Sequence, residues 1–332
     1  MIALWLVATA AIACLLTGWL RQYALSRQVL DVPNERSSHA VVTPRGGGMA
    51  IALTFIGAAV IGQWLYELPW SFLVAACGLG ALVALVGFMD DRHGVAPAIR
   101  LFVHFVAAGG AVALVYQGAD LGAVLPSVPP WLAGTVAAVA MVWLLNLYNF
   151  MDGIDGIAGI EAITVCFGGA LVFAASGSEL WRPSLFLLGS VAGFLYWNFP
   201  SARIFMGDAG SGFLGFVLAV FCLQAATISA ECFFAWIILL GVFVVDATVA
   251  LFRRLIRGKR IYVAHRSHAY QHAAERLGAH APVSLAVGAI NLAWLLPLAL
   301  LVSLSVIDWL VGVTIACLPL VYLALRFRSG VG

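Results

Sequence analysis

The chain has 332 residues, of which 63% are hydrophobic and only 10% are Asp, Glu, Lys or Arg, and its formal net charge is +2. Soluble domains usually carry about 25% charged residues, so the composition excludes an ordinary soluble protein and indicates an integral membrane protein. The small net charge gives no sign of a nucleic acid partner, and we expect none.

Long apolar stretches alternate with short polar connections along the whole chain. Because backbone polar groups inside a bilayer must be hydrogen-bonded within their own segment, these stretches are expected to be helices. No Lys or Arg precedes Arg21, so the first stretch is expected to be an uncleaved helix rather than a signal peptide. We therefore expect an all-α, multi-pass membrane protein with about eleven transmembrane helices in one domain over residues 1–332. The expected bounds are 1–20, 47–65, 70–89, 98–116, 131–149, 158–175, 183–198, 210–228, 232–252, 283–303 and 305–325.

The basic residues are distributed very unevenly between the two sides of this arrangement. Of the 17 Lys and Arg residues, only Arg182 falls on one side, and all the others fall on the opposite side. Cytoplasmic connections of membrane proteins are enriched in Lys and Arg. We therefore expect the N-terminus outside the cytoplasm and the C-terminus inside it.

Acidic residues also gather near helix ends on the expected cytoplasmic side. Carboxylates so close to hydrocarbon are costly, and they are usually paired or functional. The acids of the opposite side fall one to each short loop, and we assign them no chemistry. The cytoplasmic group consists of Asp90, Asp91, Asp152, Asp155, Asp208 and Asp246.

The first two candidate motifs flank the second and third expected helices. In RSSHAVVTPRGGGMAI, Arg45 stands beside glycines that would let backbone N–H groups approach a phosphate. In GFMDDRHG, the adjacent carboxylates of Asp90 and Asp91 repel one another and need a cation or a proton. They could belong to a metal or phosphate site, or they could end a helix with Arg92 as their counter-charge.

The stretch WLLNLYNFMDGIDGIAGIEA places Asn146, Asn149, Asp152 and Asp155 at steps of three residues. On a continuous helix each step would rotate the position by about 60°, so the four side chains could not share one narrow face. The glycines that begin at Gly153 disfavour a continued helix. We expect the helix to end there and the following turn to present the two acids to a ligand. The alternative is an interfacial loop with solvated acids.

Two further motifs lie on the same side of the membrane. NFPSARIFMGDAGSGFLG places Asp208 just before an expected helix, where free N–H groups can bind an anion and a carboxylate can bind a metal. Asp208 could also be a simple N-cap, and Phe205 could stack on a flat ring or anchor at the interface. RRLIRGKRIYVAHRSHAYQHAAERLG carries His265, His268 and His272 after five Lys and Arg residues.

This basic loop favours a cradle for phosphate over a zinc site, which would need a further Cys or acidic ligand nearby. Contact with anionic lipid is the alternative. Carboxylates and basic groups on one side of the membrane together predict a Mg²⁺-dependent reaction on a polyanionic substrate. Mg²⁺ prefers one or two carboxylates together with substrate phosphates.

Six strings resemble, in the same order, motifs of the polyprenyl-phosphate N-acetylhexosamine-1-phosphate transferases. They are TPRGGGMAI, GFMDD, NLYNFMDGIDGIAGIEA, NFPSARIFMGDAGSGFLG, VVDATVALFRR and HRSHAYQ. HRSHAYQ looks most similar to the bacterial branch that starts O-antigen synthesis. The resemblance implies transfer of N-acetylhexosamine-1-phosphate (GlcNAc or a 6-deoxy-HexNAc) from a UDP-sugar to undecaprenyl phosphate, with release of UMP. It also implies a multi-pass protein of the bacterial inner (plasma) membrane.

The resemblance assigns roles to residues of the matching strings. Asp208 would be a ligand of Mg²⁺, for which Mn²⁺ is the alternative, and Asp152 and Asp155 would belong to the nucleotide and metal site. Asn198 and Phe205 match positions near the uridine. The implied catalytic groups are Asp90, Asp91, Asp152, Asp155, His265 and His268, and the other implied substrate-binding groups are Arg45, Asn149 and Arg266.

Two departures and two other functions qualify this expectation. Gly94 stands where the family often has a third acid, and HRSH replaces a run of adjacent histidines. A transporter or lipid flippase without transferase chemistry, or a non-catalytic scaffold of a glycan-assembly complex, would also suit a polytopic chain. The expected partners are UDP-N-acetylhexosamine, undecaprenyl phosphate in the bilayer and, as dimers in the family imply, a second copy of the chain.

Overall fold

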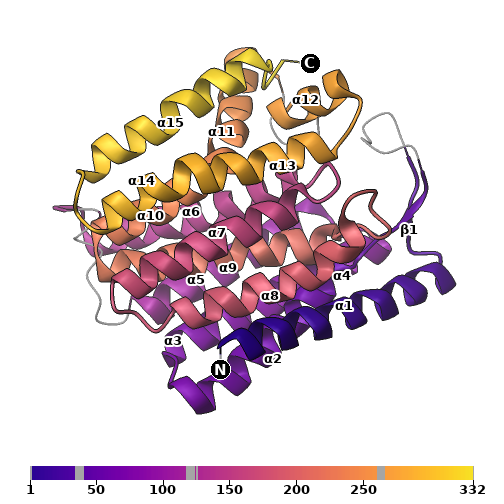
Figure 1. The fold of residues 1–332 in the computed structure, drawn as a ribbon, viewed down its shortest axis with the longest axis horizontal. Helices are drawn as coiled ribbons and strands as arrows, with labels where there is room; N and C mark the ends of the chain where they lie inside the picture. Colours follow the sequence, from indigo (N-terminus) through magenta and orange to yellow (C-terminus); the bar gives the residue numbers. More distant parts are fainter. Residues whose placement is uncertain (1, 34–40, 117–123, 125, 260–265, 332) are drawn as a thin grey trace.

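The computed structural model describes residues 2–33, 41–116, 124, 126–259 and 266–331, and it is built almost wholly of helices (Figure 1). Two short strands pair antiparallel, Leu30 opposite Pro44 and Asp31 opposite Thr43. The elements of the first half are α1 (Ile2–Ser26), β1 (Leu30–Asp31), β2 (Thr43–Pro44), α2 (Gly48–Tyr66), α3 (Trp70–Leu73), a π-helical segment (Val74–Leu79), α4 (Gly80–His93), α5 (Pro97–Val115) and α6 (Pro130–Met151). Those of the second half are α7 (Ile157–Ala175), α8 (Trp181–Asn198), α9 (Gly207–Ile228), α10 (Ala230–Leu239), α11 (Gly241–Ile256), α12 (Ala269–Leu277), α13 (Ala281–Ile290), a π-helical segment (Asn291–Leu295), α14 (Leu296–Ser303) and α15 (Trp309–Arg326).

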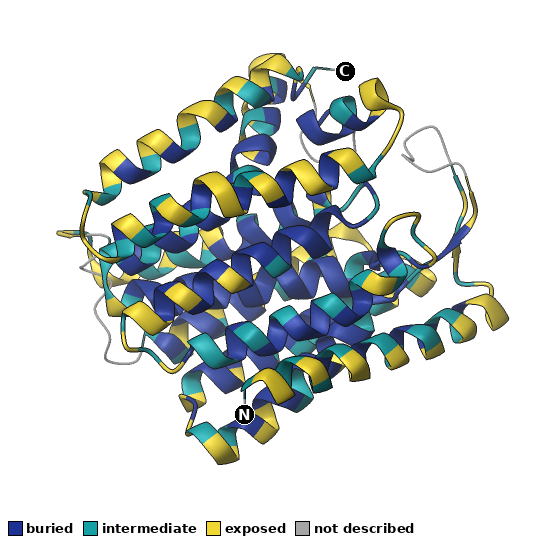
Figure 2. Ribbon diagram, in the orientation of Figure 1, coloured by how far each residue is buried: buried dark blue, intermediate teal, exposed yellow. Residues whose placement is uncertain are grey.

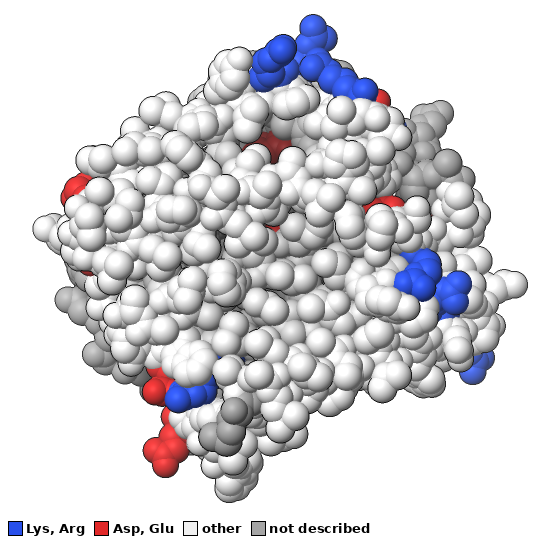
Figure 3. Space-filling model, in the orientation of Figure 1, with Lys and Arg blue, Asp and Glu red and all other residues white. Residues whose placement is uncertain are grey.

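Among the described residues, nine helical stretches are long and apolar enough to cross a membrane, and there are ten if α10 and α11 count as one span. The all-α, multi-pass architecture expected from the sequence is therefore confirmed. The expected span over 183–198 is α8, which has Arg182 and Pro183 in its first turn and is not among these stretches. Figure 3 shows one face of the molecule as a broad, largely uncharged surface, with the Lys and Arg side chains towards its margins and small acidic patches in hollows; such a surface suits contact with lipid.

The expected single span over 232–252 is two helices, α10 and α11, which meet at an angle of 74°. The break lies at Leu240, whose φ of −80° and ψ of 3° leave the helical conformation. Gly241 follows, and a Cβ at that position would lie only 3.2 Å from the Leu320 side chain. A residue without a side chain therefore lets the bend pack closely against α15.

Helix α9 lies in the centre of the bundle and is buried over most of its length (Figure 2). It packs against α2, α4, α6 and α10, as expected for a helix that is apolar on all sides. Glycines let two neighbours reach its backbone: a Cβ on Gly48 would lie 2.2 Å from Gly210 Cα, and one on Gly87 would lie 2.5 Å from the Asp208 carbonyl. These contacts fix the first turn of α9, and with it Asp208, against α2 and α4.

We predict that Gly48→Ala destabilises the protein by about 1–3 kcal/mol, because the added methyl group would overlap the α9 backbone. Thermal unfolding in detergent measures the effect. The matched control is Gly57→Ala, also in α2, where a Cβ would meet nothing within 4 Å. Equal melting temperatures for the two variants would contradict the close approach of α2 to α9.

Candidate active site

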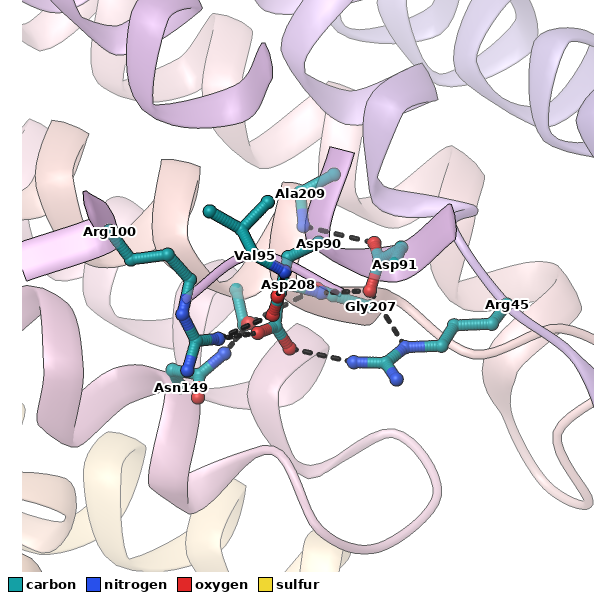
Figure 4. Close-up of polar contacts among 10 residues, drawn as sticks. Arg45, Asp90, Asp91, Val95, Arg100, Asn149, Gly207, Asp208 and Ala209 are labelled. Carbon is teal, nitrogen blue, oxygen red and sulfur yellow. Dashed lines mark hydrogen bonds and ion pairs between the residues drawn. The ribbon is translucent and has the colours of Figure 1, made fainter. Parts of the chain in front are cut away.

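The carboxylate of Asp208, in the first turn of α9, lies between two arginines that reach it from opposite sides (Figure 4). Its Oδ1 atom accepts a hydrogen bond from Arg45 Nη2 at 2.8 Å, and its Oδ2 atom accepts one from Arg100 Nη1 at 2.7 Å. Arg100 also pairs with Asp90. Residues from the β2–α2 connection, α4, α5 and α9 thus meet at one point.

Asp91 forms the base of this cluster. Its side chain is fully buried, and its Oδ1 atom accepts from Arg45 Nε at 2.7 Å and from the Asp208 N–H at 2.9 Å. Its Oδ2 atom accepts from the Ala209 N–H at 3.2 Å. Asp91 therefore caps α9 from the neighbouring helix and holds Arg45 in place, which satisfies N–H groups that have no partner within the helix.

The counter-charge of the two adjacent acids differs from the sequence-based alternative. Arg92 donates to the Tyr23 hydroxyl at 2.8 Å and lies over the rings of Tyr23 and Phe88. Arg100, ten residues beyond Asp90, pairs with Asp90 instead, and Arg45 pairs with Asp91. Sequence reasoning overlooked Arg100 as a site residue, although an arginine inside an apolar stretch requires a partner and was itself the signal.

Helix α6 ends at Met151 and α7 begins at Ile157, as the glycines of the connecting segment predict. Asp152 is half-buried at this end, and burial together with the negative charge of the neighbouring Asp208 raises its pKa to about 7. Asn149 donates to the Ser211 hydroxyl at 2.8 Å and so ties α6 to α9, whereas Asn146 donates to the Val142 carbonyl of its own helix. The two asparagines therefore have different roles, and only Asn149 lies in the cluster.

The 152–156 turn is joined to the 199–206 loop by side-chain hydrogen bonds. The buried Asn198 accepts from the Gly156 N–H and donates to the Ile204 carbonyl, both at 3.0 Å. Gly156 has a φ of +74°, and a Cβ there would lie 2.6 Å from the Phe199 ring, so glycine is required on both counts. The structure thus places Asn198 beneath the loop as a bridge between two backbone segments.

Phe205 lies at the end of the same loop. Its N–H donates to the Pro44 carbonyl at 2.8 Å, and its own carbonyl accepts from the Gly47 N–H at 2.9 Å. The ring is half-buried. This pairing holds the aromatic side chain beside the segment that carries Arg45.

Asp246 of α11 organises the described part of the basic loop. Its carboxylate accepts from the N–H groups of Ala269 and Tyr270, at 2.9 and 3.2 Å, and lies 3.8 Å from His268 Nδ1. The Tyr270 hydroxyl donates to the Phe150 carbonyl at 3.0 Å, and a Cβ on Gly153 would lie 2.2 Å from it. The start of α12 is therefore fastened to the end of α6. The sequence singled out Asp246 only as one acid among six.

The other basic-loop residues are placed differently. The Arg266 guanidinium pairs with Glu275 at 3.1 Å on α12. His265 lies outside the described residues. His280, which the sequence did not single out, lies 3.3 Å from the Asp155 carboxylate; its isolated position in the sequence offered no signal.

The donor set suits a metal only in combination with a ligand. In the part of the chain that the structure describes, no three His, Cys, Asp or Glu side chains group closely enough to hold a metal ion. Mg²⁺ commonly takes one or two protein carboxylates and completes its coordination with water and substrate phosphate. Asp208 and Asp152, whose charges influence one another at the adjoining ends of α9 and α6, fit that partial donor set.

Comparison with known proteins bears on the same residues. Residues 72–226, which include Asp90, Asp91, Asp152 and Asp208, match the model of glycosyl transferase family 4. A probable undecaprenyl-phosphate N-acetylglucosaminyl 1-phosphate transferase of Bacillus subtilis is 27% identical over 274 residues, 76% of this chain and 72% of the relative. An undecaprenyl-phosphate alpha-N-acetylglucosaminyl 1-phosphate transferase of Salmonella typhi is 29% identical over 267 residues, 75% of this chain and 70% of the relative.

A mycobacterial relative matches over a shorter part of its length. The decaprenyl-phosphate N-acetylglucosaminephosphotransferase of Mycobacterium leprae is 30% identical over 239 residues, which are 65% of this chain and 59% of the relative. The resemblance found in the sequence motifs is confirmed by these matches. Over the stretch that carries its acidic motifs, the chain is therefore similar to glycosyl transferase family 4, and over most of its length it is similar to polyprenyl-phosphate N-acetylglucosaminyl 1-phosphate transferases.

Proposed function

We propose that this chain transfers N-acetylhexosamine-1-phosphate from a UDP-sugar to undecaprenyl phosphate and releases UMP. The observation that carries the proposal is the Asp208 carboxylate held between Arg45 and Arg100, with Asp152 beside it, at one end of the helix bundle. Such a cluster offers both cationic groups for phosphates and carboxylates for a metal. The names of the relatives favour GlcNAc as the sugar and a polyprenyl phosphate as the acceptor.

In the proposed reaction, an oxygen of the lipid phosphate attacks the sugar-linked phosphorus of the UDP-sugar. The bond from that phosphorus to the bridging oxygen breaks, and UMP leaves with the electron pair. A phosphomonoester has a second pKa of about 6 and is largely ionised at neutral pH, so a strong base is not required and we favour direct attack. When bound, Mg²⁺ (or Mn²⁺) would offset the charge of the diphosphate.

The residues of the site would take different parts in this reaction. Asp208 and Asp152 would hold the metal, and Arg45 and Arg100 would exchange part of their carboxylate contacts for substrate phosphate. Asp90 would remain beside Arg100 on the lipid-phosphate side, and its second oxygen accepts from the Val95 N–H at 2.6 Å. The basic residues His268 and Arg266, together with His265, would serve the diphosphate.

The proposal includes an arrangement in the membrane. We propose eleven spans, with α8 included and α10 and α11 forming one bent span, an outer N-terminus, and the site on the cytoplasmic side of a bacterial inner membrane. The distribution of Lys and Arg supports this orientation.

O-antigen or a similar surface glycan would be the pathway, with a 6-deoxy-HexNAc as the alternative sugar. A homodimer is the proposed assembly. The acids of the site lie at one end of the helices rather than along their middle, which favours a transferase over a transporter.

We predict that purified protein with undecaprenyl phosphate, UDP-GlcNAc and Mg²⁺ releases UMP, and that Asp208→Asn lowers turnover by about 10²–10³-fold, the size seen when one preorganised electrostatic group is removed from an active site. Coupled detection of UMP and product mass measure the effect. The control is Asp308→Asn, which changes an exposed cap at the start of α15. Absence of UMP with every UDP-HexNAc tried, in folded protein, would rule out the proposed reaction.

We predict that Arg45→Lys lowers kcat/KM by about tenfold or more, because lysine cannot reach Asp91 through one nitrogen and Asp208 through another. Steady-state kinetics with varied undecaprenyl phosphate measure the change. Arg326→Lys, at the exposed end of α15, is the control for loss of a guanidinium on the same side. Unchanged kinetics in Arg45→Lys would show that the paired geometry is not used.

A further inference from the structure

A second polar cluster joins α13 and its continuation to α7, beside the 152–156 turn. His280, Ser284, Gly288 and Asn291 are spaced by four, four and three residues, so they lie along one face of the α13 span. Each of them meets α7 or the turn that precedes it. The family motifs quoted above do not include these four residues.

Two side chains at the N-terminal end of this face, those of His280 and Ser284, contact Asp155. The Asp155 backbone N–H donates to His280 Nδ1 at 3.4 Å, and Asp155 Oδ1 lies 3.3 Å from the same nitrogen. The Ser284 hydroxyl donates to the Asp155 carbonyl at 2.8 Å. The other carboxylate oxygen of Asp155 accepts from the Ala202 N–H at 3.0 Å. One carboxylate therefore bridges α13 and the 199–206 loop.

Deeper contacts keep α13 from shifting along α7. Asn291 donates through Nδ2 to Glu161 Oε2 at 2.7 Å and to the Thr164 hydroxyl at 2.8 Å, and both Glu161 and Asn291 are buried. A Cβ on Gly288 would lie 2.9 Å from the Ile160 side chain, so the two helices pack closely. His280 is thus held at a fixed place relative to Asp155.

Asp155 fastens the 199–206 loop, which carries Phe205. Asp155 precedes Gly156, whose N–H is bonded to Asn198, and Ala202 precedes Phe205 by three residues. The half-buried Phe205 ring therefore depends on the same loop that Asp155 fastens. The oxygens of Asp155 lie against His280 and the Ala202 N–H, whereas those of Asp208 pair with the two arginines of the cluster.

We propose that His280 is a positioning residue for the donor nucleotide: it holds Asp155 against the 199–206 loop and thereby fixes the surface on which the base of the UDP-sugar binds. This inference rests on the proposed transferase function. Asp155 would then hold the nucleotide site in place, and Asp208 and Asp152 would bind Mg²⁺. His280 acts through Asp155 and has no part in the phosphoryl transfer itself.

The test compares His280→Ala, His280→Asn and His280→Gln in the UMP-release assay. The asparagine amide occupies about the place of the histidine Nδ1 atom and can bond Asp155, whereas the glutamine amide extends to the place of Nε2. We expect His280→Ala and His280→Gln to raise the KM for UDP-GlcNAc about tenfold, the size associated with the loss of one hydrogen bond. We expect kcat, the KM for undecaprenyl phosphate and the Mg²⁺ requirement to stay within about twofold, and His280→Asn to recover the wild-type KM.

The matched control is Asp308→Ala. Like His280, Asp308 stands at the start of a helix and accepts from a backbone N–H, here that of Leu310 at 2.8 Å. Asp308 has no place in the candidate site, and we expect wild-type kinetics. Calorimetric titration with UMP gives a second readout of nucleotide affinity that does not need turnover.

Three results would overturn the inference. The first is an unchanged KM for UDP-GlcNAc in folded His280→Ala. The second is equal behaviour of His280→Asn and His280→Gln, which also decides the matter if His280→Ala fails to fold. The third is a raised Mg²⁺ requirement, which would make Asp155 a metal-site residue. Lack of turnover in the wild type with every UDP-HexNAc would instead contradict the proposed function, and UMP titration of the same variants would still test His280.

Discussion

Partial burial of the Asp208 carboxylate at the start of a central helix is the constraint around which the site is arranged. A charge removed from water is costly unless it is paired and hydrogen-bonded. Arg45 and Arg100 supply the pairing from two different elements, and Asp91 orients Arg45 while capping the helix that carries Asp208. The glycines Gly48 and Gly87 make this possible, because only residues without side chains let α2 and α4 reach the α9 backbone.

Carboxylates of the same side take three different roles in this arrangement. Asp91 and Asp246 accept from backbone N–H groups at the starts of α9 and α12, so their charge is used to hold helices in place. Asp155 bridges a histidine and a loop. Asp208 pairs with the guanidinium groups of Arg45 and Arg100, and substrate phosphate would take over part of the contacts that these arginines make with the carboxylate. Function therefore follows from the partner of each acid rather than from its residue type.

Much of this organisation was visible in the sequence, for physical reasons. The apolar stretches predict membrane helices, and the glycines after Met151 predict the end of α6. Both predictions succeed because they depend only on residues that are neighbours in the sequence. The acids of separate strings could be assigned to one side of the membrane from the alternation of spans. The motif resemblance then connected them to one family, which the comparisons confirm.

Other features depend on contacts between distant segments, and the sequence does not reveal them. In the sequence, Arg100 indicates only which side of the membrane its segment faces. In the structure, α5 brings it into contact with Asp90 and Asp208. The bend at Leu240 lies where Gly241 packs against Leu320 of α15, and Asn198 shows its bridging role only when Gly156 and Ile204 lie on either side of it. His280 is separated from Asp155 by more than a hundred residues, so no local pattern could have joined them.

The central claim is that the carboxylate of Asp208 receives the metal when a nucleotide sugar is present. Binding of Mn²⁺, as a paramagnetic substitute for Mg²⁺, to purified protein with UDP-GlcNAc can be followed by electron paramagnetic resonance. We predict one tightly bound ion per chain in the wild type and binding weaker by about tenfold or more in Asp208→Asn. Equal binding of Mn²⁺ by wild type and Asp208→Asn would contradict the claim.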